Sequence, residues 1–196
     1  MEGNRAAKTR RLIEIKRYLA DMHSFKAKVA SAAAGAVAAW PAQIPIHEFG
    51  HWIAARAYGL ETQFYFLGDR ITQQIIYAGD VSPLERGVIA MGGPIAEYVS
   101  AFTALMVSRK AGKDSNLKPA AAMYAFSAAS NPLNYALTDM GRDFLVISDI
   151  GIPKPVQIAV TTALSAPLMY MSFKELYKSI MPVAKRIIDR QASMKR

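Results

Sequence analysis

Four long stretches of the sequence carry almost no charge, and they constrain the fold more than any other feature. Residues 29–46, 119–137 and 155–173 contain no Asp, Glu, Lys or Arg, and residues 87–108 contain only Glu97. A helix that crosses a membrane needs about 20 mostly apolar residues. Four such stretches in 196 residues predict a mainly α-helical, polytopic membrane bundle of about four transmembrane helices.

The basic residues are segregated from these stretches. The formal net charge is +9, and 19 of the 24 Lys and Arg residues lie in residues 1–28, 109–118 and 174–196. If all four stretches span, these three segments share one side, which the positive-inside rule assigns to the cytoplasm. We therefore expect an integral, multi-pass protein in the lipid bilayer with cytoplasmic termini. Nucleic acid is not an expected partner, because the basic residues flank apolar segments and no known binding module occurs.

The same pattern divides the chain into three regions. We expect a basic amphipathic N-terminal helix over residues 1–28, a membrane-embedded core over 29–173 and a basic amphipathic tail over 174–196. Pro41 and Pro45 could break the first span into two pieces. The apolar face of the N-terminal helix could lie on a membrane surface or pack on the protein. That face is formed by Leu12, Ile15, Leu19 and Met22.

One segment between the first and second spans has a different periodicity. Residues 61–80 carry aromatic and β-branched side chains on both sides of Gly68-Asp69. This composition predicts a short β-hairpin. Its first strand contains three consecutive aromatic residues, Phe64, Tyr65 and Phe66.

The residues best suited to bind a metal and to catalyse a reaction lie in one short motif. The chain has no Cys and three His, so any metal must be held by His and carboxylate side chains. His47 and His51 enclose Glu48 in an H-E-x-x-H pattern. On a helix, positions i and i+4 share a face, so both imidazoles can reach one metal while the Glu accepts a proton from bound water. The remaining histidine, His23, lies in a basic segment and is expected at the surface.

A catalytic zinc site uses three protein ligands and leaves one position open. The third ligand here must be a carboxylate, and Asp139 is favoured because it follows the far end of the third span, at the depth of His47. Glu97 lies halfway along the second span and stays open as a rival ligand or second proton shuttle. The plausible carboxylates are Glu97, Asp139, Asp143 and Asp149.

Three segments resemble the site-2 protease family of intramembrane zinc metalloproteases. Residues 47–66, HEFGHWIAARAYGLETQFYF, resemble the family's zinc-binding helix and membrane-associated hairpin. Gly93-Pro94-x-x-Glu97 is similar to its Gly-Pro-x-x-Asn helix, with Glu in place of Asn. The segment from Asn131 to Gly141 resembles its Asn…Pro…Asp-Gly segment, although Pro132 follows Asn131 directly and Met140 splits the Asp-Gly pair.

The resemblance implies a function and roles for individual residues. It implies Zn²⁺ held by His47, His51 and Asp139, with Glu48 as general base and acid and Asn131 steadying the oxyanion. The implied activity is hydrolysis of peptide bonds within or next to transmembrane segments of substrate proteins. It also implies a site near the cytosolic face, whereas the charge count places the site toward the outer face.

Two alternatives to a membrane protease stay open. The altered Asn131–Gly141 segment would suit a catalytically idle membrane scaffold or regulator that binds client helices. An Ala-rich helical core would also suit a peripheral small zinc peptidase. In the protease interpretation, the hairpin could hold an unwound substrate segment by strand addition, with Phe64, Tyr65 and Phe66 as the substrate-binding residues.

Overall fold

A computed structural model describes residues 2–66, 73–78, 80–138 and 142–194, and it describes side chains over 9–63, 80–138 and 142–194. Within the described residues the chain forms five helices and two strands. In chain order they are α1 (Glu2–Ala57), β1 (Glu61–Phe66), β2 (Gln73–Ala78), α2 (Pro83–Lys110), α3 (Leu117–Thr138), α4 (Arg142–Asp149) and α5 (Lys154–Met194). The mainly helical class expected from the sequence is confirmed.

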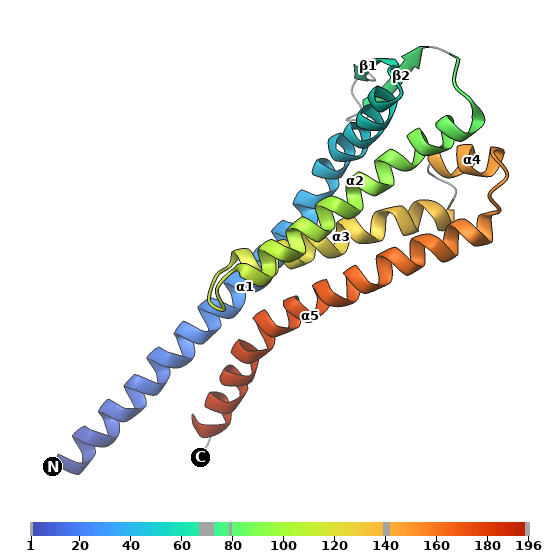
Figure 1. Ribbon diagram of the computed structural model, residues 1–196. Coiled ribbons are helices and arrows are strands. Elements are labelled where there is room, and N and C mark those ends of the chain that lie inside the picture. The colour runs from blue at the N-terminus through green and yellow to red at the C-terminus, as the bar shows by residue number, and fades with distance from the viewer. Residues whose placement is uncertain (1, 67–72, 79, 139–141, 195–196) are drawn as a thin grey trace.

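The four long helices form an elongated bundle (Figure 1). α3 packs against α1, α2 and α5, and nine of its 22 residues are buried. The short helix α4 and the two strands lie at one end of the bundle, and both chain termini lie at the other end (Figure 1). Any site built from α1, α2 and α4 therefore lies at the end remote from the termini.

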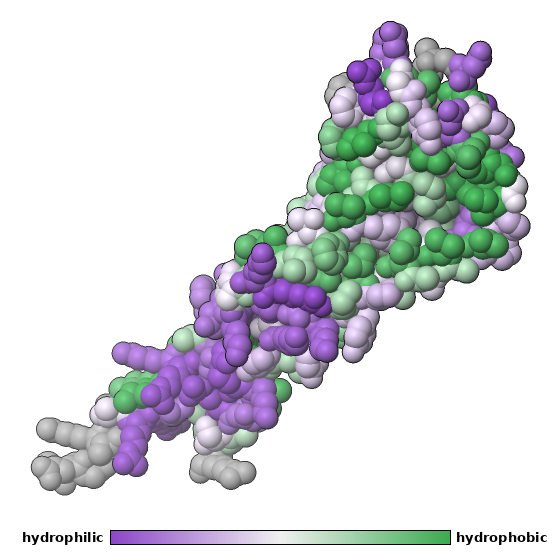
Figure 2. All heavy atoms as spheres, in the orientation of Figure 1, coloured by the Kyte–Doolittle hydropathy of each residue, from purple (hydrophilic) through white to green (hydrophobic). Residues whose placement is uncertain are grey.

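The distribution of side chains is inverted relative to a water-soluble protein. Large apolar side chains cover the outside of the bundle, including Trp40 at 76% exposure and Val99 at 60%. Polar side chains such as Gln43 and Thr161 are buried inside it. A broad apolar band covers the visible face of this part of the molecule (Figure 2). Lipid solvates apolar side chains, whereas polar ones need internal partners, so the inversion fits a bundle embedded in a membrane.

Three helices are long and apolar enough to cross a membrane: α1, α2 and α5. The fourth expected span, residues 119–137, falls within α3, which does not reach the same apolarity over the described residues. α3 is rich in Ala, and its buried surface is made mostly of Ala: Ala121, Ala122, Ala125, Ala128, Ala129 and Ala136. Small side chains let neighbouring helices approach closely, which suits the position of α3 against α1, α2 and α5.

Glycines allow close contacts between α1 and its neighbours. A Cβ on Gly35 would collide with the backbone of Ala120 in α3, and a Cβ on Gly50 would collide with the backbone of Gly92 in α2. Gly50 lies between His47 and His51, so this contact fixes the position of the H-E-x-x-H motif along the axis of α2. Only glycine permits so close an approach of two helix backbones.

The possible break at Pro41 and Pro45 does not occur. α1 is helical through both prolines and ends at Ala57, where Gly59 adopts a positive φ of 74°. A proline removes one helical hydrogen bond, but packing against neighbouring helices commonly holds such a helix together in membranes. The H-E-x-x-H motif therefore belongs to the same helix as the basic N-terminal segment.

The two ends of the chain pack together in a stem, formed by residues 9–28 of α1 and 174–194 of α5. Asp21 accepts hydrogen bonds from Arg186 at 3.0 Å and from Arg190 at 2.8 Å. The expected region boundaries after residues 28 and 173 thus fall inside continuous helices. Of the expected apolar face of α1, Leu12, Ile15 and Leu19 are exposed, because the polar side of the helix contacts α5. Figure 2 shows that the surface of the stem is mostly hydrophilic.

Buried cations mark the junction between stem and bundle. Lys28 is 1% exposed and donates to the carbonyl of Lys113 at 2.9 Å. Lys118 pairs with Glu175 at 2.8 Å. These contacts tie α1, the α2–α3 connection and α5 together at the stem side of the apolar band.

The two strands pair antiparallel, with Glu61 opposite Ala78 and Phe66 opposite Gln73. They contact α1 and leave no second layer of sheet within the described residues. Each strand has six residues, so the pair is a small ribbon at the α4 end of the bundle and not an independent unit.

Candidate metal site

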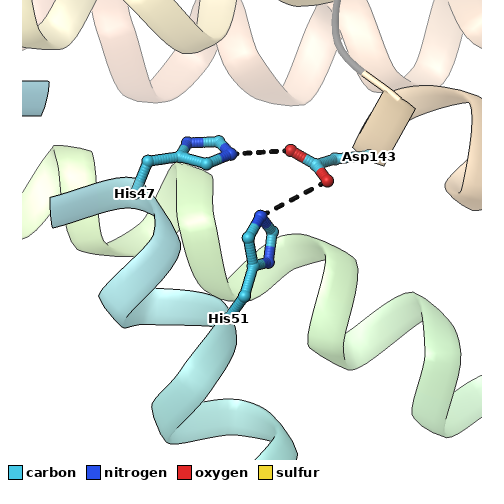
Figure 3. A group of neighbouring side chains, drawn as sticks. All are labelled: His47, His51 and Asp143. Atoms are coloured by element: carbon cyan, nitrogen blue, oxygen red, sulfur yellow. Dashed lines mark hydrogen bonds and ion pairs between the residues drawn. The ribbon is translucent and has the colours of Figure 1, made fainter. Parts of the chain in front are cut away.

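His47, His51 and Asp143 come together at the α4 end of the bundle (Figure 3). His47 Nε2 lies 2.8 Å from Asp143 Oδ2, and His51 Nε2 lies 3.3 Å from Asp143 Oδ1. The two rings are 4.7 Å apart and nearly perpendicular. One potential ligand atom from each residue lies within 4.8 Å of the others. In a tetrahedral zinc site with bonds of about 2.1 Å, ligand atoms are about 3.4 Å apart, so this spacing fits such an ion.

In both rings the outer nitrogen, Nδ1, which points away from Asp143, already has a hydrogen-bonding partner. His51 Nδ1 lies 2.7 Å from the carbonyl oxygen of Ile89, and a carbonyl can only accept, so Nδ1 carries the proton. The backbone N–H of Gly93 lies farther from the same nitrogen, at 3.3 Å, so the shorter contact sets the tautomer. His47 Nδ1 lies 3.1 Å from Glu97 Oε1. Such contacts leave Nε2 as the free lone pair, as in histidines that bind a metal.

In this tautomeric state, Nε2 of His47, Nε2 of His51 and both carboxylate oxygens of Asp143 carry lone pairs and no proton. Two Nε2 lone pairs face the two oxygens of a single carboxylate, an arrangement that is repulsive unless a cation lies among them. A proton or a metal ion can fill this role. When protons on Nε2 of His47 and His51 fill this role, burial raises the pKa of Asp143, but the hydrogen bonds and charges of the two imidazoles outweigh burial and hold that pKa well below its ordinary value. The carboxylate is therefore ionised at neutral pH.

The helix α4 positions Asp143. Its first turn contains Asp143, where the helix dipole stabilises a negative charge. Phe144 and Ile147 are each 3% exposed and pack with Ala90 of α2 and Ala136 of α3. The apolar face of this eight-residue helix thus anchors it to the bundle and turns the carboxylate toward α1.

The helix α2 packs directly against the two imidazoles of the site. Its start is fixed by a capping box, in which the Ser82 side chain accepts from the backbone N–H of Glu85 while the Glu85 side chain accepts from the backbone N–H of Ser82. Farther along α2, a Cβ on Gly93 would lie 2.5 Å from His47 Nε2 and 2.6 Å from His51 Nε2. The backbone of α2 therefore lies against both candidate ligand atoms, and a side chain at position 93 would displace an imidazole.

Two predicted residues lie behind His47. Glu97 is fully buried, and its Oε1 also accepts from Asn131 Nδ2 at 2.7 Å. Glu97 thus contacts the outer nitrogen of His47, on the opposite side of the ring from Asp143. The Asn131 amide, for which the family resemblance implies an oxyanion role, is here engaged by Glu97.

Glu48 follows His47 in α1 and lies near α3. It is partly buried, and its charge acts on the hydroxyl of Tyr135. The Tyr135 ring is 5.9 Å from the His47 ring, in an edge-to-face arrangement. Glu48 is therefore near the His47 side of the candidate site.

The other sequence predictions have different outcomes. Asp139, the favoured third ligand, lies outside the described residues, as do the side chains of Phe64, Tyr65 and Phe66. His23 and Asp149 are exposed and do not belong to the candidate metal group. Asp143 was one of four plausible carboxylates in the sequence, and the pattern that could have singled it out is the apolar pair Phe144 and Ile147 behind it.

Comparisons with protein-family models, with curated proteins and with solved structures find no match to this chain. The candidate site is thus defined by its own geometry.

Proposed function

We propose that this protein is an integral membrane zinc metalloprotease that hydrolyses peptide bonds within or next to transmembrane segments of substrate proteins. The observation that carries the proposal is the convergence of His47 Nε2, His51 Nε2 and the Asp143 carboxylate, with both outer ring nitrogens engaged elsewhere. The similarity of the three sequence segments to site-2 proteases supports the same function.

The residues present fit a zinc ion. Two imidazoles and one carboxylate are a common ligand set for catalytic zinc, and they leave the fourth position open. A zinc ion bound there would lower the pKa of a bound water to about 7 and act as a Lewis acid. His47, His51 and Asp143 would hold the ion. Asp139 is the ligand that the family resemblance implies, and a carboxylate so close in sequence could replace or supplement Asp143.

Glu48 follows His47 directly in the motif and lies near Tyr135. We assign it the proton transfers: it accepts a proton from the attacking water and delivers it to the leaving amine. The ribbon of β1 and β2 lies at the same end of the bundle (Figure 1), where it could pair with an unwound substrate strand through Phe64, Tyr65 and Phe66. A substrate helix must unwind first, because its backbone amides are hydrogen-bonded to one another.

The membrane context supports an intramembrane substrate. α3 is enclosed by the three helices that are apolar enough to span, so it would cross the membrane with them as a fourth helix. The exposed apolar band and buried polar interior argue against a peripheral peptidase. Carbonate extraction of membranes tests this point: an integral protein stays in the pellet, whereas a peripheral one is released.

Glu48→Gln tests the mechanism in purified, reconstituted protein. The variant should retain one zinc per chain and lose cleavage of a transmembrane peptide substrate, because glutamine cannot accept the proton. Loss of cleavage by a factor of about 10² to 10⁴ corresponds to the usual contribution of general acid–base catalysis. Cleavage at the unmodified rate would refute the assigned role, and absence of zinc from the unmodified protein would favour the idle scaffold.

A further inference from the structure

A buried pair, Glu97 and Asn131, lies behind the proposed metal site and has no part in the ligand set. Glu97 has zero exposed surface and lies on α2, one turn before the small apolar cluster of Ala101 and Ala128. Its Oε1 accepts from Asn131 at 2.7 Å and lies 3.1 Å from His47 Nδ1. Its Oε2 is buried without a hydrogen-bond partner among the described residues.

A carboxylate in this position needs a compensating positive charge. Burying an isolated carboxylate is costly, and such groups are paired or neutralised in folded proteins. Among the ion pairs formed by the described residues, that of Glu97 is with His47, and no Lys or Arg side chain pairs with it. The cation that balances Glu97 is therefore the imidazole of His47 or a charge held on the other side of that ring.

A divalent metal ion in the proposed site would supply the positive charge that balances the Glu97 carboxylate. A divalent ion with two neutral imidazoles and the Asp143 carboxylate carries a net charge of +1. The Glu97 carboxylate, joined to the ion through His47, brings the whole assembly to zero. An amide at position 97, as in the family pattern, would leave that positive charge uncompensated in a low-dielectric interior.

We propose that Glu97 and Asn131 are positioning residues that hold His47 through Nδ1 and make the metal centre electrically neutral. Asn131 orients Glu97 by donating to the same oxygen that contacts His47. Outer carboxylates of this kind fix the ring and raise its basicity as a ligand. This inference depends on the proposed metal site and extends the proposed function, because it explains how tightly the ion is bound.

Zinc affinity, measured by competition with a chromophoric chelator in detergent, tests the inference without reference to activity. Glu97→Gln should weaken zinc binding about 10- to 100-fold, the usual effect of losing such a partner. The absorption bands of the Co²⁺-substituted protein should shift as well, because the ligand field of His47 changes. Asn131→Ala should weaken zinc binding in the same direction, and adding it to Glu97→Gln should cause little further loss.

Two matched variants act as controls. Glu175→Gln alters a carboxylate that is 6% exposed and paired with Lys118 at the stem end of the bundle, so it perturbs the fold but not the metal centre. Asn134→Ala removes an exposed amide from the same helix as Asn131. Both should bind zinc with unmodified affinity. If Glu97→Gln fails to fold, Glu97→Asp keeps the charge but shortens the reach, and it should bind zinc more weakly.

The outcomes separate the two proposals. If the unmodified protein binds no zinc, the proposed function fails and the inference fails with it. If the unmodified protein binds zinc and Glu97→Gln binds it equally well with an unchanged Co²⁺ spectrum, only the positioning role is refuted. Weaker binding in Glu175→Gln as large as that in Glu97→Gln would also refute it, because the effect would then be general destabilisation.

Discussion

Gly93→Ala is the smallest change that should abolish the proposed metal site. The new methyl carbon would lie 2.5 Å from His47 Nε2 and 2.6 Å from His51 Nε2, whereas ordinary contacts begin near 3.4 Å. The imidazoles or the α2 backbone must therefore move by about 0.9 Å, which is more than the roughly 0.2 Å by which metal–ligand distances vary. Zinc affinity should fall by about 100-fold or more, beyond the usual effect of an outer residue.

The destabilisation of the fold must be separated from the effect on the site. Overpacking a core commonly costs about 1–3 kcal/mol of unfolding free energy. Gly35→Ala is the matched variant, because its methyl carbon would collide with the backbone of Ala120 in α3, twelve residues before His47 along α1. Gly112→Ala is the neutral variant, since no atom lies within 4 Å of its added Cβ.

The experiment measures zinc stoichiometry by mass spectrometry and thermal stability in detergent for all three variants. Together, these measurements distinguish loss of the metal from destabilisation of the fold. We expect Gly35→Ala to lower thermal stability but keep one zinc, Gly112→Ala to change neither, and Gly93→Ala to lose the metal. Unmodified zinc affinity in a folded Gly93→Ala protein would show that the two Nε2 atoms are not the ligands.

Further predictions concern the third ligand, the cofactor and the orientation. Asp143→Asn should weaken zinc binding more than Asp139→Asn, as measured by chelator competition, and the reverse order would assign the ligand to Asp139. Removal of the metal with a chelator should abolish cleavage of a reconstituted substrate, and added Zn²⁺ should restore it; persistent cleavage after complete removal would exclude a zinc enzyme. Because the chain has no Cys, single cysteines report topology cleanly: Gly112→Cys should react with an impermeant maleimide from the cytoplasmic side and Asp80→Cys from the outer side. The opposite labelling would reverse the orientation that the basic residues favour.

The sequence predicted the parts of this protein that depend on composition and local spacing. Long uncharged stretches located the apolar helices, and the i, i+4 spacing placed His47 and His51 on one face of α1. The two strands could be expected from the aromatic and β-branched residues around a turn. Each of these features depends on residues that are close together in the chain.

Features that depend on three-dimensional packing were harder to predict. Depth in the membrane could not separate Asp139 from Asp143, because both follow the same helix, and only the packing of Phe144 and Ile147 brings Asp143 to α1. The periodicity of the stem likewise left two orientations open for the apolar face of α1. The ion pairs of Asp21 turn the polar face toward α5, so the apolar face points away from the protein.

The contact between the two ends of the chain has a consequence for biosynthesis. α1 leaves the ribosome first and carries His47 and His51, but α4 and α5 are the last helices to be made. A nascent chain therefore holds two histidines and the Glu97 carboxylate in the membrane before Asp143 can reach them. The ion pairs of Asp21 with Arg186 and Arg190 form only when synthesis is nearly complete. A chain interrupted before α4 would therefore be inserted without Asp143 and without the cations that hold the stem together.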